Sequence, residues 1–226
     1  MSRVSNALLA ILLVISCFTP THTKASSLTS DIAAQSQVLL PYKTQIEVRL
    51  KSNQDLIHRI AKKLVKSSLP TEFILIPMLE SSYDPSAVSH ANAAGLWQLM
   101  PQTAERFGLH VSDSNDQRFD VEASTNAAIS YLQFLYLKFN DLALTLAAYN
   151  SGEGRVARAI SKAKSREFSK LRLPEETRRY VHRFYALQKL ISTEKLLQNS
   201  KRFYLFGHQS TLPLIDLTPL PPLVKL

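Results

Sequence analysis

Cysteine is almost absent from this chain of 226 residues, and the single one, Cys17, lies in an apolar run near the N-terminus. A lone cysteine cannot form a disulfide within the chain, so we expect no disulfide to stabilise the fold. Glycine is also scarce, with five residues, and runs of β-branched residues are few, whereas alanine and leucine are frequent. This composition favours a mostly helical protein, and the length suits one domain with extensions.

Metal-ligand patterns are missing as well. His110 has no second His or Cys at ligand spacing, so we assign it to a loop and expect no metal or other cofactor.

Charge is unevenly distributed along the chain, whose formal net charge is +9. Residues 71–154 carry 3 basic and 10 acidic groups, whereas residues 155–202 carry 14 basic and 4 acidic groups. A basic surface attracts polyanions such as nucleic acid, anionic lipid or an anionic cell-wall polymer. The alternative is that these charges are simply the solvated faces of helices.

The N-terminal segment has the pattern of a secretory signal peptide. Arg3 precedes an apolar run over residues 7–18, which is too short to span a bilayer comfortably, and Pro20 ends the run. We expect cleavage after Ala25, because signal peptidase requires a small residue there. Alternatively, the tetrapeptide ending in Cys17 resembles a lipobox, at which bacterial lipoproteins are cut before the cysteine and acylated on it. The predicted location is periplasmic, with attachment to the outer membrane through a lipid on Cys17 as the alternative.

The remaining chain divides into three predicted segments. Residues 26–45, rich in Ser and Thr at first, are interpreted as a linker, and residues 201–226, which contain several prolines, as an extended tail. Residues 46–200 form the predicted domain. Apolar spacing, caps and breakers predict its helices over residues 46–64, 70–80, 102–107, 121–139, 142–148 and 155–164, and from Pro174 onward.

One carboxylic acid, Glu80, is set between apolar segments. It directly follows the run from Phe73 to Leu79, and a second apolar segment extends from Ala93 to Met100. Burial disfavours the charged form of a carboxyl group, so we expect the pKa of Glu80 to be raised and its proton to be retained near neutral pH. That is the property of a general acid. The alternative is a helix-end glutamate that faces water.

Two polar clusters accompany this acid, and they read Gly95-Leu96-Trp97-Gln98 and Ala148-Tyr149-Asn150-Ser151-Gly152. Amide and phenol groups hydrogen-bond to hydroxyl and acetamido groups, and aromatic faces suit sugar rings. Taken singly, Trp97 fits a core position and Asn150 fits a helix C-cap.

Four segments in this order resemble the motifs of the lysozyme-like lytic transglycosylases, glycoside hydrolase family 23. They are Glu80-Ser81, Gly95-Leu96-Trp97-Gln98, Ala148-Tyr149-Asn150 and Glu176-Thr177-Arg178-Arg179-Tyr180. The similarity covers about residues 69–190, and the membrane-bound D-type subgroup looks closest. Trp97 departs from the Met common in the soluble branch but suits this subgroup. The subgroup usually carries LysM wall-binding repeats, and none is recognised in this sequence, so we expect the basic half to retain the substrate.

The resemblance implies an all-α, lysozyme-like fold and an enzyme that cuts the β-1,4 bond between N-acetylmuramic acid and N-acetylglucosamine in peptidoglycan. Glu80 would protonate the leaving oxygen and then act as base for the muramoyl 6-hydroxyl, which gives a 1,6-anhydro product. The resemblance also implies that Tyr180 meets Glu80 directly. The implied sugar-site residues are Ser89, Gln98, Met100, Tyr149, Asn150 and Tyr180.

Ordinary glycosidases use two carboxylates, and no second acid of comparable setting is evident here. Asp84 lies in a turn signal, Asp120 at a predicted helix cap and Glu153 in a glycine-rich turn. Two alternatives to a transglycosylase stay open, a hydrolytic lysozyme on the same fold and a non-catalytic cell-wall-binding protein. A nucleic-acid partner is opposed by the export signal and by the acidic charge around Glu80.

Overall fold

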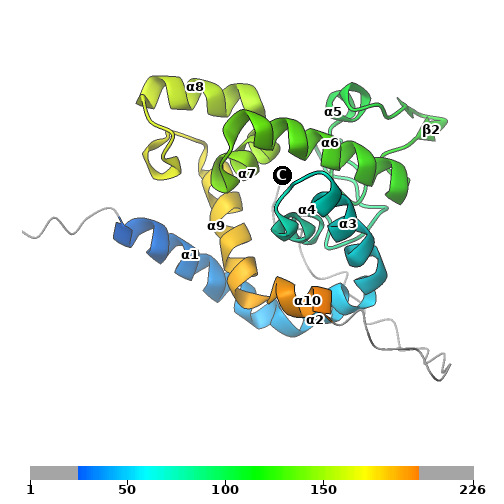
Figure 1. Ribbon diagram of the computed structural model, residues 1–226, viewed down its shortest axis with the longest axis horizontal. Helices are drawn as coiled ribbons and strands as arrows, with labels where there is room; N and C mark the ends of the chain where they lie inside the picture. Colours follow the sequence, from blue (N-terminus) through cyan, green and yellow to red (C-terminus); the bar gives the residue numbers. More distant parts are fainter. Residues whose placement is uncertain (1–24, 199–226) are drawn as a thin grey trace, which may run out of the picture.

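The computed structural model describes residues 25–198, which are mostly helical, so the all-α prediction is confirmed (Figure 1). The elements in chain order are α1 (Ala25–Leu39), η1 (Leu40–Tyr42), α2 (Lys43–Ser52), α3 (Gln54–Lys66), η2 (Thr71–Leu75), α4 (Ile76–Glu80), α5 (Pro101–Arg106), β1 (Val111–Ser112), β2 (Asn115–Asp116), α6 (Val121–Phe139), α7 (Leu142–Ser151), α8 (Glu153–Ala163), η3 (Phe168–Lys170), α9 (Glu175–Leu190) and α10 (Thr193–Gln198). The strands β1 and β2 form a single antiparallel hairpin. Among these described helices, none has the combination of length and apolar character needed to cross a bilayer.

Predictions for both ends of the chain fall outside these residues. They are the signal peptide over residues 1–25, apart from Ala25 at the start of α1, the alternative cut before Cys17, and the tail over residues 201–226.

The predicted linker over residues 26–45 is wrong, because this segment forms α1, η1 and the start of α2. Ile32 and Leu39, seven residues apart on one face of α1, are buried, and α1 packs along α9. The Arg183 Nε on α9 also donates a hydrogen bond of 3.0 Å to Gln35 Oε1 on α1. Ser and Thr are weak helix formers, so local propensity suggested a loose segment. Packing against α9 outweighs that propensity.

Two predicted helices are each divided in the structure. The helix predicted from residue 46 breaks at Asn53, whose side chain donates to Arg49 O at 2.9 Å, so α2 and α3 are separate. The helix predicted to deliver Glu80 consists of the 3₁₀ segment η2 followed by the short α4. Pro77 lies in the first turn of α4, where the missing N–H has no intrahelical partner to lose. Glu80 is therefore the last residue of a short helix that begins only four residues earlier, at Ile76.

The bounds of α6 match the prediction, and both its ends have a local cause. Asp120 Oδ1 accepts a hydrogen bond of 2.7 Å from Ala123 N, which caps the start of the helix. Asn140 ends it in the left-handed conformation, with φ of 44°. Asp141 then caps α7, with its Oδ1 accepting from Leu144 N at 2.8 Å.

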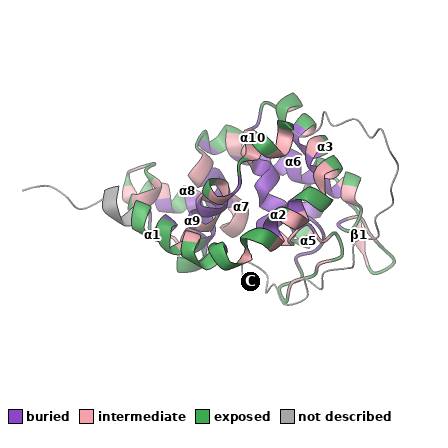
Figure 2. Ribbon diagram, turned by 90° about the horizontal axis from the view of Figure 1, so that it is seen from below, coloured by how far each residue is buried: buried purple, intermediate pink, exposed green. Residues whose placement is uncertain are grey.

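The core is centred on α7, which contacts α6, α8 and α9 (Figures 1 and 2). Five consecutive residues of α7, from Leu144 to Ala148, are buried. Burial on every face is typical of a helix in the middle of a core. Packing on several sides therefore fixes the end of α7, which carries Tyr149 and Asn150.

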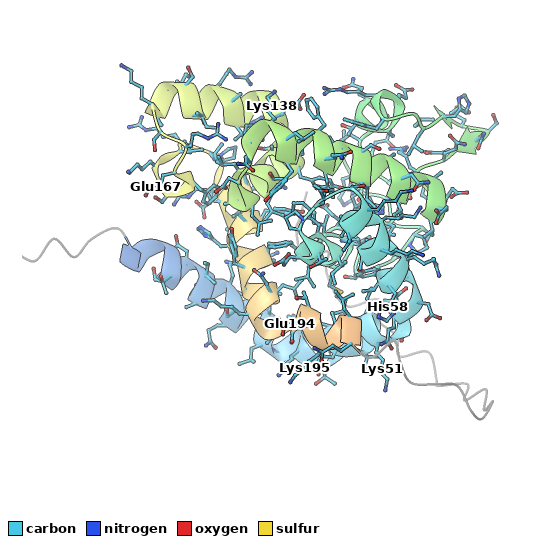
Figure 3. The ribbon with its side chains drawn as sticks, viewed as in Figure 1. Lys51, His58, Lys138, Glu167, Glu194 and Lys195 are labelled. Atoms are coloured by element: carbon cyan, nitrogen blue, oxygen red, sulfur yellow. The ribbon has the colours of Figure 1, made fainter. Side chains whose placement is uncertain are left out.

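The last described helix, α10, packs against α3. Figure 3 shows the charged side chains of Glu194 and Lys195 on the outside of α10.

Candidate active site

The segment between α4 and α5, residues 81–100, folds as an irregular loop over the end of α4. Ser82, Tyr83 and Gln98 adopt positive φ values in it. Ser81 Oγ donates to Leu96 O at 2.8 Å, which joins the residue after Glu80 to the far side of the loop. The loop therefore holds the end of α4 in place.

Arg118 anchors this loop through hydrogen bonds to its backbone. Its side chain is 5% exposed, and its Nη2 pairs with Asp116 Oδ2 at 2.6 Å. The hydrogen bond from Arg118 lowers the pKa of Asp116. The Nη1 of Arg118 donates to the loop carbonyls of Asn92, at 2.6 Å, and Leu99, at 3.2 Å. A charged group this deep needs such partners, and here the partners are the loop backbone.

Trp97 is a core residue, as one of its two interpretations held. Its side chain is fully buried, and its Nε1 donates to Thr125 Oγ1 on α6 at 3.0 Å. The carbonyl oxygen of Trp97 accepts a hydrogen bond of 2.7 Å from Tyr149 Oη. Trp97 therefore positions the site but offers no ring face to a sugar.

Glu80 is partly buried and meets Tyr180, whose Oη donates to Glu80 Oε1 at 2.6 Å. The expected contact between these two residues is therefore present. Burial raises the pKa of Glu80 from 4.5 to about 7, and the hydrogen bond from Tyr180 acts in the opposite direction, since it stabilises the charged form. The predicted rise in pKa is confirmed, and Glu80 exchanges its proton readily near neutral pH.

The neighbouring phenols keep their protons. Burial raises the pKa of Tyr180 and of Tyr149 well above 10, and the negative charge of Glu80 raises both further. Both hydroxyl groups therefore act as permanent hydrogen-bond donors beside a carboxyl group that titrates.

We expect Glu80→Gln to stabilise the fold more at pH 8 than at pH 5. Because the pKa of Glu80 is higher in the folded state, about 7 against 4.5, its stabilising contribution is complete below pH 4.5 and is lost as the pH rises through about 7. Ionised Glu80 then costs about 3 kcal/mol relative to the protonated form. Thermal unfolding of variant and wild type at the two pH values measures this. Glu105→Gln, on the exposed side of α5, is the control and should show no such change. A Tm difference for Glu80→Gln that is the same at both pH values would contradict the expectation.

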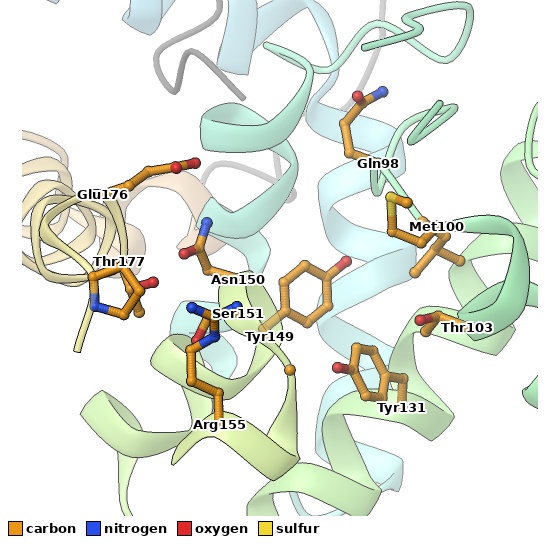
Figure 4. Close-up of a pocket in the computed structure, with 13 residues that line it drawn as sticks. Gln98, Met100, Thr103, Tyr131, Tyr149, Asn150, Ser151, Arg155, Glu176 and Thr177 are labelled. Atoms are coloured by element: carbon orange, nitrogen blue, oxygen red, sulfur yellow. The ribbon is translucent and has the colours of Figure 1, made fainter. Parts of the chain in front are cut away.

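A cavity of about 430 Å³ opens between the loop, the end of α7 and the start of α9. It is lined by Gln98, Leu99, Met100, Thr103, Tyr131, Tyr149, Asn150, Ser151, Gly152, Arg155, Pro174, Glu176 and Thr177. Figure 4 shows Gln98, Met100 and Thr103 on one side and Asn150 and Glu176 on the other, with Tyr149 between them.

The structure brings together most of the residues expected at the sugar site. Gln98, Met100, Tyr149 and Asn150 line the cavity. Glu80 and Tyr180 are not among its lining residues. Tyr180 lies one turn along α9 from Thr177, which lines the cavity, and its hydroxyl group bonds to Glu80, so the acid lies close to the cavity wall.

Two expected site residues have structural partners. Ser89 is not among the cavity-lining residues, and its Oγ accepts from Ala93 N at 3.0 Å, which closes a turn of the loop. The Nε2 of Gln98 donates to the carbonyls of Ala87, at 2.9 Å, and Gly95, at 3.0 Å. Only the amide oxygen of Gln98 is left to accept a hydrogen bond from a ligand.

Several lining residues had no role in the sequence analysis. Glu176 and Thr177 belong to a motif quoted there, and Arg155 follows the glycine-rich turn, so these two signals were available. Tyr131 lies in the middle of α6, and no local pattern sets it apart. Glu176 is a second carboxylate at the cavity, but it is exposed, unlike Glu80. Among the described residues, no group of three His, Cys, Asp or Glu side chains gathers to hold a metal ion.

The chain is similar to known proteins over much of its length. Residues 58–172, about half of the chain, match the family described as Transglycosylase SLT domain. The chain is 42% identical over 178 residues to the membrane-bound lytic murein transglycosylase D of Escherichia coli K12, a match that covers 76% of this chain and 38% of that protein. It is 31% identical over 152 residues to the membrane-bound lytic murein transglycosylase C of Haemophilus influenzae PittEE, covering 60% of this chain and 42% of that protein.

Solved structures show the same fold. The 70 kDa soluble lytic transglycosylase from Escherichia coli superimposes with a TM-score of 0.53 at 26% identity, covering 74% of this chain and 29% of that one. A complex of the 70 kDa soluble lytic transglycosylase with bulgecin A gives a TM-score of 0.54 at 25% identity, with the same coverage of 74% and 29%. The chain thus spans less than half the length of these relatives. The family match ends at residue 172, before α9 and Tyr180.

Proposed function

The chain belongs to the transglycosylase SLT domain family, and we propose that it is a lytic transglycosylase that cleaves the MurNAc-β-1,4-GlcNAc bond of peptidoglycan and leaves 1,6-anhydro-MurNAc ends. One observation carries the proposal. The carboxyl group of Glu80, with a pKa of about 7, is bonded to Tyr180 on α9, the helix whose start lines a cavity of amide and phenol groups. A pKa near the working pH lets one group both give and accept a proton.

In this mechanism protonated Glu80 donates its proton to the glycosidic oxygen as the bond from C1 of MurNAc to that oxygen breaks. The GlcNAc side leaves with a new hydroxyl group. The Glu80 carboxylate then accepts the proton of the MurNAc 6-hydroxyl while O6 bonds to C1. The acid is restored and no water is consumed.

Tyr180 is a positioning residue in this proposal. Its hydrogen bond to Glu80 Oε1 stabilises the carboxylate formed after the first proton transfer and directs the other oxygen toward the substrate. Asn150 and the amide oxygen of Gln98 are the groups at the cavity that suit the acetamido substituents of the sugars.

We expect Tyr180→Phe to move the alkaline limb of the pH–rate profile to higher pH and to lower kcat. The hydrogen bond favours the ionised carboxyl, so its removal raises the pKa of Glu80 further. Hydrogen bonds to charged groups contribute about 1.5–3 kcal/mol, which corresponds to roughly a 10- to 100-fold loss in kcat.

The matched control is Tyr83→Phe, which also deletes a buried phenol oxygen, one that donates to Ile74 O at 2.5 Å. It should lower stability without moving the limb. An alkaline limb that stays in place in Tyr180→Phe would remove Tyr180 from the mechanism.

A hydrolytic lysozyme is the second candidate, because Glu176 places another carboxylate at the cavity. Ordinary glycosidases use such a pair, one acid and one base for water. Mass spectrometry of sacculi digested with the purified protein separates the two. Anhydro ends, lighter by one water, support the transglycosylase, whereas reducing ends support the hydrolase. Release of neither product would contradict both.

We place the enzyme in the bacterial periplasm, where peptidoglycan lies. The signal-peptide pattern of residues 1–25 supports this location, and attachment to the outer membrane through a lipid on Cys17 is the alternative.

A further inference from the structure

Helix α8 presents a row of basic side chains that begins at the cavity. Arg155, Arg158 and Lys162 are exposed and are spaced by three and four residues, which puts them on one face of the helix. The adjoining side of the helix carries Val156 and Ala159, which are buried. Figure 3 shows side chains along the outer side of α8 extending away from the body of the domain. We call the three basic residues the α8 strip.

Within residues 25–198, no acidic side chain forms an ion pair with the α8 strip. The only acidic residue of α8, Glu153, pairs with Arg106 on α5 at 2.7 Å, and this hydrogen bond lowers the pKa of Glu153. Among the described residues, the three members of the α8 strip make no ion pair or hydrogen bond with one another or with other side chains. Their charge is therefore available to a ligand.

The α8 strip is continuous with the cavity. Arg155 lines the cavity directly (Figure 4). The guanidinium of Arg158 reaches back one turn, since a Cβ on Gly154 would lie 3.3 Å from its Nη1. From Arg155 to Lys162 the helix rises about 10 Å. A chain that leaves the cavity at this end passes cationic groups over that distance.

Other basic residues of the same region are engaged differently. Arg166 donates to the backbone oxygen of Phe139, and Lys170 pairs with Glu167. The sequence suggested that the whole basic half retains the substrate. In the structure fewer of its cations are available, and α8 carries the available cations that adjoin the cavity.

We propose that the α8 strip binds the carboxylates of the peptide stems that project from a glycan strand held in the cavity, so that stem-bearing strands bind better than bare ones. The inference rests on the proposed function, because a glycan in the cavity is what brings the stems to α8. Peptide carboxylates match the α8 strip in charge, and their spacing along a flexible stem lets them reach exposed cations without a formed pocket.

The test compares wild type with Arg158→Gln/Lys162→Gln, which leaves Arg155 and the cavity unchanged. The substrates are soluble glycan strands of equal length, with intact stems or with the stems removed by an amidase. At about 0.1 M salt we expect wild type to show a KM roughly three- to tenfold lower for stem-bearing strands. The variant should lose this difference while its kcat on bare strands stays unchanged. At about 1 M salt, where the Debye length is ~3 Å, wild type should lose the difference too.

Lys62→Gln/Lys66→Gln is the matched control. It removes the same charge at the same spacing of four residues, from exposed positions on α3, which contributes nothing to the cavity. It should behave as wild type. An equal loss in the control would mean that net charge, not the α8 strip, sets affinity, and would overturn the proposal.

Three other results would overturn it. The first is a wild-type KM that is the same for stem-bearing and bare strands, and the second is a variant whose binding to bare strands is weakened as much as its binding to stem-bearing strands. The third is a variant whose only defect is weaker binding to vesicles of anionic phospholipid. Fluorescence anisotropy of end-labelled strands gives the binding comparison without turnover. If wild type cuts neither strand, the proposed function fails, and the anisotropy measurement still decides whether the α8 strip distinguishes stems.

Discussion

Glu80→Gln is expected to abolish cleavage of peptidoglycan while the protein stays folded. Glutamine has the shape of glutamate and still accepts the hydrogen bond from Tyr180, but it has no acidic proton to transfer to the glycosidic oxygen. General acid–base groups contribute about 10²- to 10⁴-fold in rate, and here one residue performs both transfers. The loss should therefore reach or exceed the upper end of that range. Release of soluble muropeptides from sacculi, followed over time, measures it.

The matched control is Glu176→Gln, which removes the other carboxylate at the cavity. Because Glu176 takes no part in the proposed proton transfers, this variant should keep its kcat and the anhydro character of its products. A Glu80→Gln variant that retains more than about a tenth of wild-type turnover would refute the assignment of Glu80. Loss of turnover in Glu176→Gln instead would favour the hydrolase.

Features of the fold that depend on neighbours in sequence could be predicted. The limits of α6 follow from a capping aspartate, Asp120, and from the Asn140-Asp141 break, and both signals are local. The helix α1 could not be predicted, because what stabilises it is the packing of Ile32 and Leu39 against α9. That partner is well over a hundred residues away in the chain, and no periodicity within a Ser- and Thr-rich segment reveals it.

The candidate site divides in the same way. The apolar run before Glu80 predicted its raised pKa, and the resemblance in motif order predicted its contact with Tyr180. The motifs did not distinguish groups that face the cavity from groups that hold the loop. Ser89, expected at the sugar site, closes a turn of the loop and is not among the cavity-lining residues. Arg118 escaped notice altogether, because its partners are backbone carbonyls and its importance appears only when the loop is folded over it.

Contact between the loop and Arg118 leads to the second large expected effect, a severe loss of stability in Gly95→Ala. Gly95 has φ of 78°, and a Cβ at this position would lie 1.9 Å from the carbonyl oxygen of Arg118 and 2.8 Å from its carbonyl carbon. Both atoms belong to the backbone, so neither can swing aside. The loop would have to lift away from the arginine that anchors it, and the hydrogen bonds to Asn92 O and Leu99 O would weaken.

We expect Gly95→Ala to lower the free energy of unfolding by about 3–5 kcal/mol, which is in the range of severe single substitutions. For a domain of this size the corresponding fall in Tm is about 10 °C or more. Gly108→Ala is the matched control, since Gly108 also has a positive φ, of 90°, but its Cβ would meet nothing within 4 Å. That variant should lose only the about 1–2 kcal/mol of a left-handed conformation. Thermal unfolding of the two proteins isolates the contact with Arg118. Equal losses would mean that backbone conformation alone requires glycine at residue 95, and that the loop does not depend on its close approach to Arg118.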